Sequence, residues 1–263
     1  MTDAYASAIA FLERDLLKHI TPLKLLHAYC SAITCHYLEH GDSAGVLLML
    51  PPRIFPSDAA DYPFTDRVVL LATTGQAAAA ALLDLVPVGG TLVFKLLDRA
   101  NYEAVAQRFA LRRVTGYSSY TSQPGQHWPT PAGVVVSETL DERCLELFVA
   151  RGHDPDEVRG RFRTGVAVSF AIIEAGSPIA VCYCYQNYGP VWEIAGVYTA
   201  SEARRAGHGR RVVAAALHIL ASRGLTPRYH VREDNLPSIR LAESLGLRPF
   251  VTIEHFLHGG AVL

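Results

Sequence analysis

The apolar and polar positions of residues 4–120 switch repeatedly between the period of a helix and the alternation of a strand. This pattern predicts helices over 4–19, 22–38, 76–86 and 100–110. It predicts strands over 43–50, 67–73, 91–97 and 111–120, with a loop rich in proline and aspartate over 51–65. Strands that alternate with helices in this way are typical of an α/β layer domain.

The pattern stops over residues 122–133, SQPGQHWPTPAG, where prolines and glycines are concentrated. Such clusters mark turns and connecting segments. We therefore expect an N-terminal α/β domain over 1–121, a linker over 122–131 and a second domain over 132–263.

Beyond the linker the alternation of helical and strand periods resumes. Helices are predicted over 141–152, 154–165, 207–224 and 235–246. Strands are predicted over 134–140, 167–175, 179–187, 191–199, 228–233 and 249–257. The turn Gly176-Ser177-Pro178 indicates an antiparallel hairpin between two of these strands. The second domain therefore also belongs to the α/β (α+β) class.

The composition narrows the class of protein. The 263 residues carry a net charge of -1 and are 50% hydrophobic, which argues against a general nucleic-acid binder. No apolar run approaches the roughly 18 residues of a membrane span. Acidic residues interrupt the N-terminal apolar pattern, so it does not resemble a signal peptide. Five cysteines, an odd number, fit reduced thiols. We expect a cytoplasmic protein that binds neither nucleic acid nor membrane.

The segment TASEARRAGHGRRVVAAAL, residues 199–217, joins a predicted strand to a predicted helix. The N-terminus of a helix exposes unpaired N–H groups and about half a positive charge. Gly207 and Gly209 would let a phosphate group approach the backbone closely. Arg204, Arg205 and Arg210 would add positive charge. The segment therefore predicts a binding site for a diphosphate.

Three phosphate-binding motifs compete for this segment. A P-loop requires a lysine after its second glycine, and none follows Gly209. A Rossmann loop requires a third glycine, and Val212 occupies that place. The pattern R-x-x-G-x-G matches residues 204–209 without a gap.

Residues 193–250 resemble the acyl-CoA-binding core of the GNAT (acetyltransferase) superfamily. GVYTASEARRAGHG is similar to its signature V-x-T/P-x-x-x-x-R-x-x-G-x-G/A, and REDNLPSIRLAESLGLRPF resembles its closing segment. In layout the chain resembles glycine N-acyltransferase-like proteins, in which a divergent N-terminal half precedes the catalytic half. The resemblance implies a C-terminal GNAT fold, with a mixed, centrally splayed sheet flanked by helices. The first domain would then be a smaller α/β domain, either of its own kind or a degenerate GNAT-like half that walls the acceptor site or forms a homodimer contact.

The resemblance also implies which residues bind acyl-CoA. The backbone of Val197 and Thr199 would pair with the pantetheine arm, and the amides of residues 205–210 would hold the pyrophosphate. The side chains of Asn235 and Ser238 would lie near the thiol end of the arm. The complete set implied for the cosubstrate is Val197, Tyr198, Thr199, Arg204, Arg205, Ala206, Gly207, His208, Gly209, Arg210, Asn235 and Ser238.

Acyl transfer to an amine requires a base, and Glu193 is the candidate, because some GNAT members carry a catalytic glutamate at this place. Strand alternation puts the apolar Ala195 and Val197 on the same face as Glu193, where desolvation would raise the pKa of its carboxyl. The alternative is a structural glutamate that faces solvent at the end of the strand.

The candidate for the acid is open. Ala242 stands where many members carry a tyrosine. Either the thiolate leaves unaided or is protonated by water, or Tyr183, Tyr229 or His230 supplies the proton.

Two further segments are predicted to be structural. His153 and Asp154 are expected in a loop that leads into a helix cap. The arginines of residues 157–165 are expected on a solvated helix face, with binding of an acidic acceptor as the alternative.

The expected function is an acyl-CoA-dependent N-acyltransferase, with acetyl-CoA as the expected donor and a primary amine of a small molecule or amino acid as the direct attacking group. No metal is expected, because Cys182 and Cys184 have no second pair of ligands nearby. The residue at 242 keeps a second hypothesis open, a catalytically impaired CoA-binding sensor or interaction module.

Overall fold

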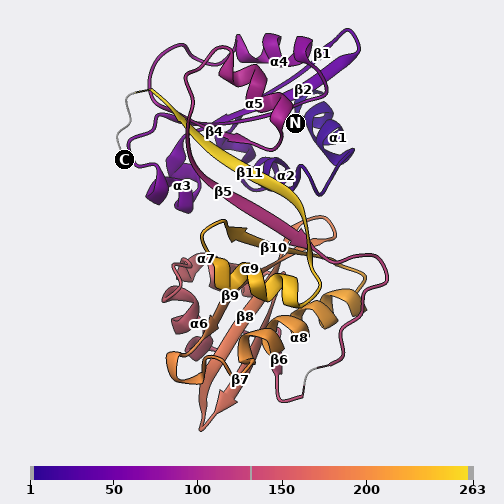
Figure 1. The fold of residues 1–263 in the computed structure, drawn as a ribbon, viewed down its shortest axis with the longest axis vertical. Helices are drawn as coiled ribbons and strands as arrows, with labels where there is room; N and C mark the ends of the chain where they lie inside the picture. The colour runs from indigo at the N-terminus through magenta and orange to yellow at the C-terminus, as the bar shows by residue number, and fades with distance from the viewer. Residues whose placement is uncertain (1–2, 131, 260–263) are drawn as a thin grey trace. The chain divides into compact units, whose positions relative to one another are not determined.

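The computed structural model describes residues 3–130 and 132–259, and these form two compact units (Figure 1). The first unit contains the described residues up to Ser118 and those from Val251 onward, and the second spans Ser119–Phe250. Residues 1–2, 131 and 260–263 of the predicted domains and linker lie outside the described residues. Two strands, β5 (Arg112–Thr121) and β11 (Arg248–His258), contribute residues to both units.

The first unit is a mixed sheet with helices. Its strands lie in the order β1 (Thr34–His40), β2 (Ser43–Leu50), β3 (Arg67–Thr73), β4 (Leu92–Leu96), β11 and β5. Its helices are α1 (Asp3–Glu13), α2 (Ile20–Tyr29), α3 (Pro56–Asp61), α4 (Gln76–Leu83) and α5 (Arg99–Ala106), with short 3-10 helices at Cys30–Ala32 and Pro52–Ile54. Only β3 and β4 are parallel among the pairs β1–β2, β2–β3, β3–β4 and β4–β11.

Two of the predictions for the first unit are wrong. The helix predicted over 22–38 ends by Ala32, and β1 follows it, paired antiparallel with β2 from Thr34↔Met49 to His40↔Ser43. The loop predicted over 51–65 contains α3. The residues of β1 become a strand because β2 offers a partner one tight turn away, where Gly41 has a φ of +59°. A preference set by such pairing is not visible in the local period.

The second unit has a sheet between two helical layers (Figure 1). Its strands lie in the order β10 (Thr226–Arg232), β9 (Val191–Thr199), β8 (Ser177–Tyr188), β7 (Ala167–Glu174) and β6 (Val135–Ser137), and β10 has β5 on its other side. One core cluster joins the sheet to α8 (His208–Ser222) and α9 (Leu236–Ser244). A second joins the opposite face to α6 (Glu142–Val149) and α7 (Pro155–Arg163). The elements predicted after the linker are confirmed, with shifted ends.

Strands β9 and β10 separate halfway along their length. Their parallel pairing runs from Val191↔Thr226 to Ile194↔Tyr229, and within the described residues β9 has no β10 partner beyond Ile194. At that point a bulge sets two residues of β9, one of them Gly196 with a φ of +61°, opposite Cys182 of β8. A bulge bends its strand. The centrally splayed sheet that the resemblance implied is therefore present.

The segment predicted as a linker packs in part on the second unit. Trp128 is buried, and its Nε1 donates a hydrogen bond to the carbonyl of Leu245 at 3.1 Å. Among the described residues, no helix combines the length and the apolar character that a membrane crossing needs.

Candidate functional site

Residues 200–207, which connect β9 to α8, form a largely exposed bend together with the first residues of α8 up to Arg210. After the 3-10 turn Ser201–Ala203 the chain enters the left-handed region twice, at Arg205 (φ +67°) and Gly207 (φ +78°). Gly207 is the N-cap residue of α8 and supplies no side chain to cap it. One residue into the helix, a Cβ on Gly209 would lie 3.2 Å from Thr199 Oγ1. The bend thus brings bare backbone to the start of α8.

The described residues accept no hydrogen bond from the central amides of this bend. In the described part of the chain, the amides of residues 205–210 donate no hydrogen bond, and the first bonded amide is that of Arg211, which donates to the carbonyl of Gly207 at 3.1 Å. These unpaired donors lie at the positive end of a 15-residue helix. Such an end of a helix suits a phosphate group.

Cationic side chains surround the bend. Arg205 and Arg210 are exposed, and neither forms an ion pair with a described residue. Arg204 donates from Nε to the carbonyl of Thr199 at 3.2 Å. His208, between the two glycines, lies with Nδ1 3.4 Å from Arg211 Nη1. The bend therefore has two guanidinium groups available to an anion.

The last residues of β9 present a free backbone edge beside the bend. The amide of Ala200 donates to the carbonyl of Ile179 on β8 at 2.8 Å. Because successive residues of a strand direct their polar groups to opposite edges, those of Thr199 and Val197 face the edge that β10 has left. This edge can accept an extended ligand as an added strand.

A cavity of about 220 Å³ occupies the fork between β9 and β10. It is lined by Arg151, His153, Tyr185, Glu193, Ile194, Ala195, Gly196, Val197, Tyr229, His230, Asn235 and Ser238. The cavity thus brings together the predicted base, two of the three candidates for the acid and three of the residues implied for the cosubstrate. Tyr198, Thr199 and residues 204–210 do not line it and continue from its edge along β9 and the bend.

Glu193 is buried and paired. Its Oε2 lies 2.6 Å from Arg228 Nη1 and also accepts a hydrogen bond from Asn187 Nδ2. The prediction that Ala195 and Val197 share a face with Glu193 is wrong for Val197. The bulge turns the side chain of Val197 toward the α8 core, while Ala195 packs on the opposite face of the sheet. Glu193 is therefore neither an isolated desolvated carboxyl nor a glutamate that faces solvent.

Arg228, which does not line the cavity itself, contacts two further polar side chains. Its Nε donates to Ser119 Oγ at 3.1 Å, and its Nη2 lies 3.1 Å from His230 Nδ1. Because a guanidinium has donors only, Nδ1 of His230 acts as an acceptor, which assigns the proton of the neutral ring to Nε2.

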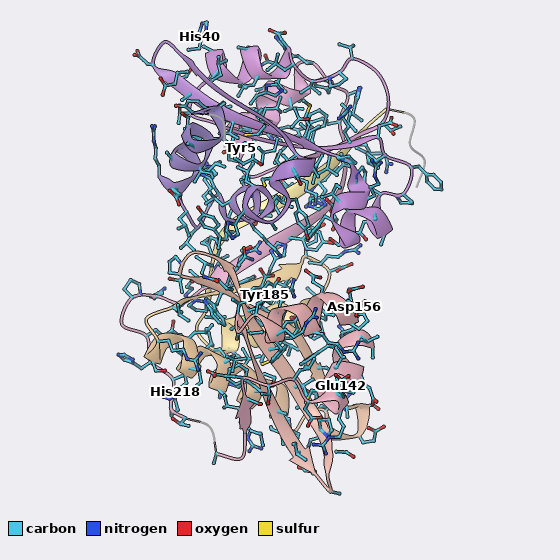
Figure 2. The ribbon with its side chains drawn as sticks, turned by 180° about the vertical axis from the view of Figure 1, so that it is seen from behind. Tyr5, His40, Glu142, Asp156, Tyr185 and His218 are labelled. Atoms are coloured by element: carbon cyan, nitrogen blue, oxygen red, sulfur yellow. The ribbon has the colours of Figure 1, made fainter. Side chains whose placement is uncertain are left out.

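A second polar group enters the cavity from the connection between α6 and α7. His153 Nδ1 lies 3.2 Å from the hydroxyl of Tyr183, which also accepts a hydrogen bond from Arg161 Nη1 at 2.8 Å. The guanidinium of Arg161 stacks 3.6 Å from the ring centroid of Tyr185, which Figure 2 labels. Burial first, and then the charge of Arg161, lower the pKa of His153. Burial raises the pKa of Tyr183.

The grouping of His153, Tyr183 and Arg161 was not predicted from the sequence. Asp154 does cap α7, accepting from the amide of Glu157 at 2.8 Å, as predicted. His153 was expected in the same loop with no further role, and Arg161 was expected on a solvated face. Helical spacing places Arg161 three residues after the buried Val158, and so on the same side of α7. Spacing alone does not identify a tyrosine partner on β8.

The α9 side of the cavity contains the implied thiol-end residues. Asn235 is the N-cap residue of α9, and its side chain accepts from the amide of Ser238 at 3.3 Å. Ser238 Oγ lies 2.6 Å from the hydroxyl of Tyr229, whose pKa burial raises to about 12. Ala242, in the place of the usual tyrosine, is fully buried in the α8 core cluster.

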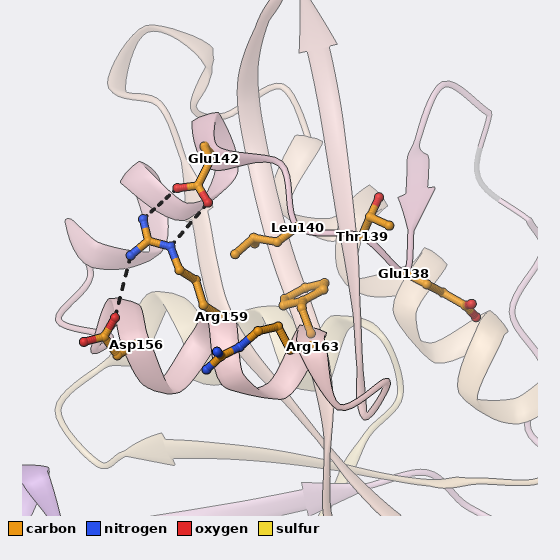
Figure 3. A pocket seen from close by; sticks show the side chains of 8 residues that line it. Glu138, Thr139, Leu140, Glu142, Asp156, Arg159 and Arg163 are labelled. Atoms are coloured by element: carbon orange, nitrogen blue, oxygen red, sulfur yellow. Dashed lines mark hydrogen bonds and ion pairs between the residues drawn. The ribbon is translucent and has the colours of Figure 1, made fainter.

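A larger cavity of about 430 Å³ lies beside α7 (Figure 3). It is lined by Glu138, Thr139, Leu140, Glu142, Asp156, Arg159, Phe162 and Arg163. Figure 3 shows Arg159 between two carboxylates, at 2.8 Å from Glu142 and 3.8 Å from Asp156. It includes no residue of β9 or of the bend. In the described ranges no group of three or more His, Cys, Asp or Glu residues could hold a metal ion.

Comparison with known proteins identifies the domain. Residues 136–247 match the model of the acetyltransferase (GNAT) family. No curated protein matches the chain by sequence.

Solved structures share the fold. A GCN5-related N-acetyltransferase from Kribbella flavida is 16% identical with a TM-score of 0.58, and the match covers 99% of this chain and 97% of that one. One from Sphaerobacter thermophilus is 13% identical with a TM-score of 0.57, covering 86% and 84%. A tandem GNAT protein from the clavulanic acid biosynthesis pathway is 13% identical with a TM-score of 0.54, covering 98% and 97%.

The matched region contains the whole β9–bend–α8 segment and every residue that lines the cavity of the fork. The chain therefore carries an acetyltransferase domain of the GNAT family at residues 136–247.

Proposed function

We propose that this chain is an N-acyltransferase that moves an acetyl group from acetyl-CoA to a primary amine by direct attack of the amine on the thioester. Membership of the GNAT family implies acyl transfer from an acyl-CoA. The observation that carries the proposal is the exposed bend at residues 205–210, whose amides have no acceptor among the described residues. It adjoins the free edge of β9, so one continuous surface suits a diphosphate and an amide-bearing arm.

In this proposal the cosubstrate binds along that surface. The pantetheine arm pairs with the backbone of Val197 and Thr199 and runs alongside Tyr198, which lies between them. The pyrophosphate accepts from the amides of residues 205–210, where Arg205 and Arg210 supply charge. The absence of a Cβ at Gly207 and Gly209 leaves room for phosphate oxygens, and Arg204, Ala206 and His208 complete the bend. Asn235 and Ser238 flank the thiol end.

The acceptor in this proposal is a small amine, because the cavity of the fork measures only about 220 Å³. Of the two acceptor classes expected from the sequence, an amino acid is favoured by Arg151. Its exposed guanidinium lines the cavity and has no ion-pair partner among the described residues. It is thus available to a carboxylate. An amino acid should then be acetylated faster than its decarboxylated amine, and an Arg151→Gln variant should lose that preference.

We further propose that the first unit, which holds most of the predicted domain 1–121 together with β11, is a degenerate GNAT-like half, and that the catalytic domain predicted over 132–263 lies in the second unit. The likeness to a protein described as a tandem GNAT supports this proposal. The start of α4 also supports it, because α4 follows a parallel strand in the first unit as α8 does in the second. At this start Ser43 Oγ already accepts a hydrogen bond from the amide of Ala78 at 3.0 Å. That helix start would bind phosphate poorly.

The test is calorimetric titration with acetyl-CoA. An Arg205→Gln/Arg210→Gln double variant removes the available charges and should bind about 100-fold more weakly, at about 1.5 kcal/mol for each charged contact. Arg163→Gln, which removes an exposed arginine elsewhere in the domain, is the matched control. Unchanged affinity in the double variant would refute the assignment of the bend.

Catalysis is tested separately, by thiol release from acetyl-CoA in the presence of a panel of amines. Turnover with any member supports the transferase. Tight binding of acetyl-CoA without turnover on the whole panel would support the second hypothesis, a CoA-binding sensor or interaction module.

A further inference from the structure

Three side chains on the wall of the cavity could accept a proton at neutral pH, namely Glu193, His230 and His153. Glu193 is the least free of them. Its Oε2 holds both Arg228, at 2.6 Å, and Asn187. Protonation would neutralise the carboxylate of Glu193 and take away the negatively charged partner of the buried Arg228 guanidinium. A proton on Glu193 is therefore disfavoured.

His230 is also unsuited to accept a proton. Its Nδ1 already accepts from Arg228 and lies 2.9 Å from Ser119 Oγ. Its remaining nitrogen carries the proton of the neutral ring. A second proton would place an imidazolium directly beside the Arg228 guanidinium.

His153 differs from both, because one of its ring nitrogens makes no hydrogen bond within the described residues. The contact between His153 Nδ1 and Tyr183 Oη fits either direction of the hydrogen bond; in the tautomer with its proton on Nδ1, Nδ1–H donates to the hydroxyl oxygen, which also accepts from Arg161. The Nε2 atom of that tautomer has a free lone pair, and within the described residues it makes no hydrogen bond. A T-shaped contact with the ring of Tyr183, at 5.4 Å between centroids, holds the imidazole in place.

We propose that His153 is the catalytic base, and that its Nε2 takes the proton of the attacking amine. This rests on the proposed acyl transfer. The amine nitrogen forms a bond to the thioester carbonyl carbon, the carbon–sulfur bond breaks, and the electron pair leaves with the sulfur. The proton that the nitrogen must lose passes to Nε2 and from there to solvent or to the thiolate. Tyr183 and Arg161 act as positioning residues, because both contact the side chain or surroundings of His153 and neither lines the cavity.

The surroundings of His153 give this step its expected pH dependence. Arg161 and Glu157 face it from α7, Tyr183 from β8, Glu193 from β9 and Arg151 from its own connection. Burial and the two arginines lower the pKa of His153, and the two glutamates oppose them more weakly, so the pKa lies below its ordinary value of 6.5. The ring is then neutral at pH 7, and turnover should fall only as the pH drops below about 6.5.

The test compares His153→Gln with the wild type at saturating acetyl-CoA. We expect kcat at pH 7 to fall about 100-fold, within the usual range for loss of a general base, with an unchanged Kd for acetyl-CoA. The kcat of the variant should rise steadily with pH, because only the amine that has already lost its proton can react. Tyr183→Phe should lower kcat by a smaller factor and keep the shape of the pH profile.

A second variant separates chemistry from structure. In His153→Ala, added imidazole should restore part of the lost turnover, which a merely structural role would not allow. Wild-type kcat and pH profile in His153→Gln would overturn the assignment of His153 alone. Absence of turnover in the wild-type protein, despite binding of acetyl-CoA, would overturn the proposed transferase and this step with it.

Discussion

The pair of Glu193 and Arg228 shows how one buried ion pair can govern several side chains. Arg228 contacts Glu193, Ser119 and His230, and the side chains of the pair are only 11% and 5% exposed. Removal of the carboxylate would take the negatively charged partner away from a buried guanidinium, which is costly in the low-dielectric interior. The predicted role of Glu193 as the base stays untested beside the proposal for His153, and the contacts of Glu193 indicate a structural role.

Glu193→Ala should therefore destabilise the protein by about 3–5 kcal/mol, the usual cost of breaking a buried pair. The measurement is the free energy of unfolding in urea. Glu146→Ala, at an exposed position of α6, is the control and should change stability little. Wild-type stability in Glu193→Ala, combined with lost turnover, would instead favour a purely catalytic glutamate.

Gly196 is a second residue at which a small change should have a large effect. Its φ is +61°, and a Cβ there would lie 2.7 Å from Phe148 Cδ1 and 2.9 Å from Tyr183 Cε1. Gly176 in the β7–β8 turn has a φ of +80° but open space around its Cβ position. Gly176→Ala should cost about 1 kcal/mol from the backbone alone, and Gly196→Ala about 1–3 kcal/mol more from the clash. Equal unfolding free energies for the two variants would contradict this account.

At the scale of elements, β11 matters for the unit that contains the N-terminus. It pairs with β4 from Glu254↔Leu96 to His258↔Leu92, and Phe256 packs into the same core cluster as α4 and α5. His255, opposite Lys95, lies with Nδ1 2.6 Å from the hydroxyl of Tyr62. The last strand of the chain thus belongs to the interior of the first unit.

Phe256→Ala should accordingly destabilise the first unit by about 3–5 kcal/mol, the cost of deleting a buried aromatic ring. Hydrogen exchange of the β4 amides would report this loss directly. Thr252→Ala, on the same strand but exposed, is the matched control. Unchanged β4 protection in Phe256→Ala would show that β11 adds little to this core.

The period of apolar residues predicted most elements, because most helices and strands here have one buried face. It failed at β1 and α3, where a neighbouring strand and buried contacts of Asp58 and Tyr62 decide the structure. It also failed for the side chain of Val197, because a bulge shifts the alternation by one residue. Bulges depend on pairing with a second strand and leave little trace in the period of one.

The candidate site was predictable where its chemistry lies in consecutive backbone. The bend of residues 204–210 has a motif because the glycines and arginines are neighbours in sequence. The partners Arg228, Arg161 and His153 come from separate elements, and no spacing relates them. Their grouping depends on the sheet order β10-β9-β8, which sequence alone does not give.

At the scale of the whole molecule, the two units differ in what their central helices offer. The amides at the start of α8 have no acceptor in the described part of the chain, whereas the start of α4 is bonded to Ser43 Oγ. We therefore expect one molecule of acetyl-CoA to bind per chain in calorimetry. Hydrogen exchange should show protection at residues 205–210 and along β9 only. A stoichiometry of two would contradict the proposal of a degenerate first half.

The sharing of β5 and β11 between the units has a consequence for biosynthesis. A ribosome releases the first 118 residues long before residues 251–258, which complete the sheet of the first unit. Until residues 251–258 have been made, the nascent chain must carry β4 with an unprotected edge, the kind of edge that recruits foreign strands. The first unit therefore cannot complete its sheet before β11 has been synthesised, and loss of residues 251–258 would damage the part of the chain that was made first.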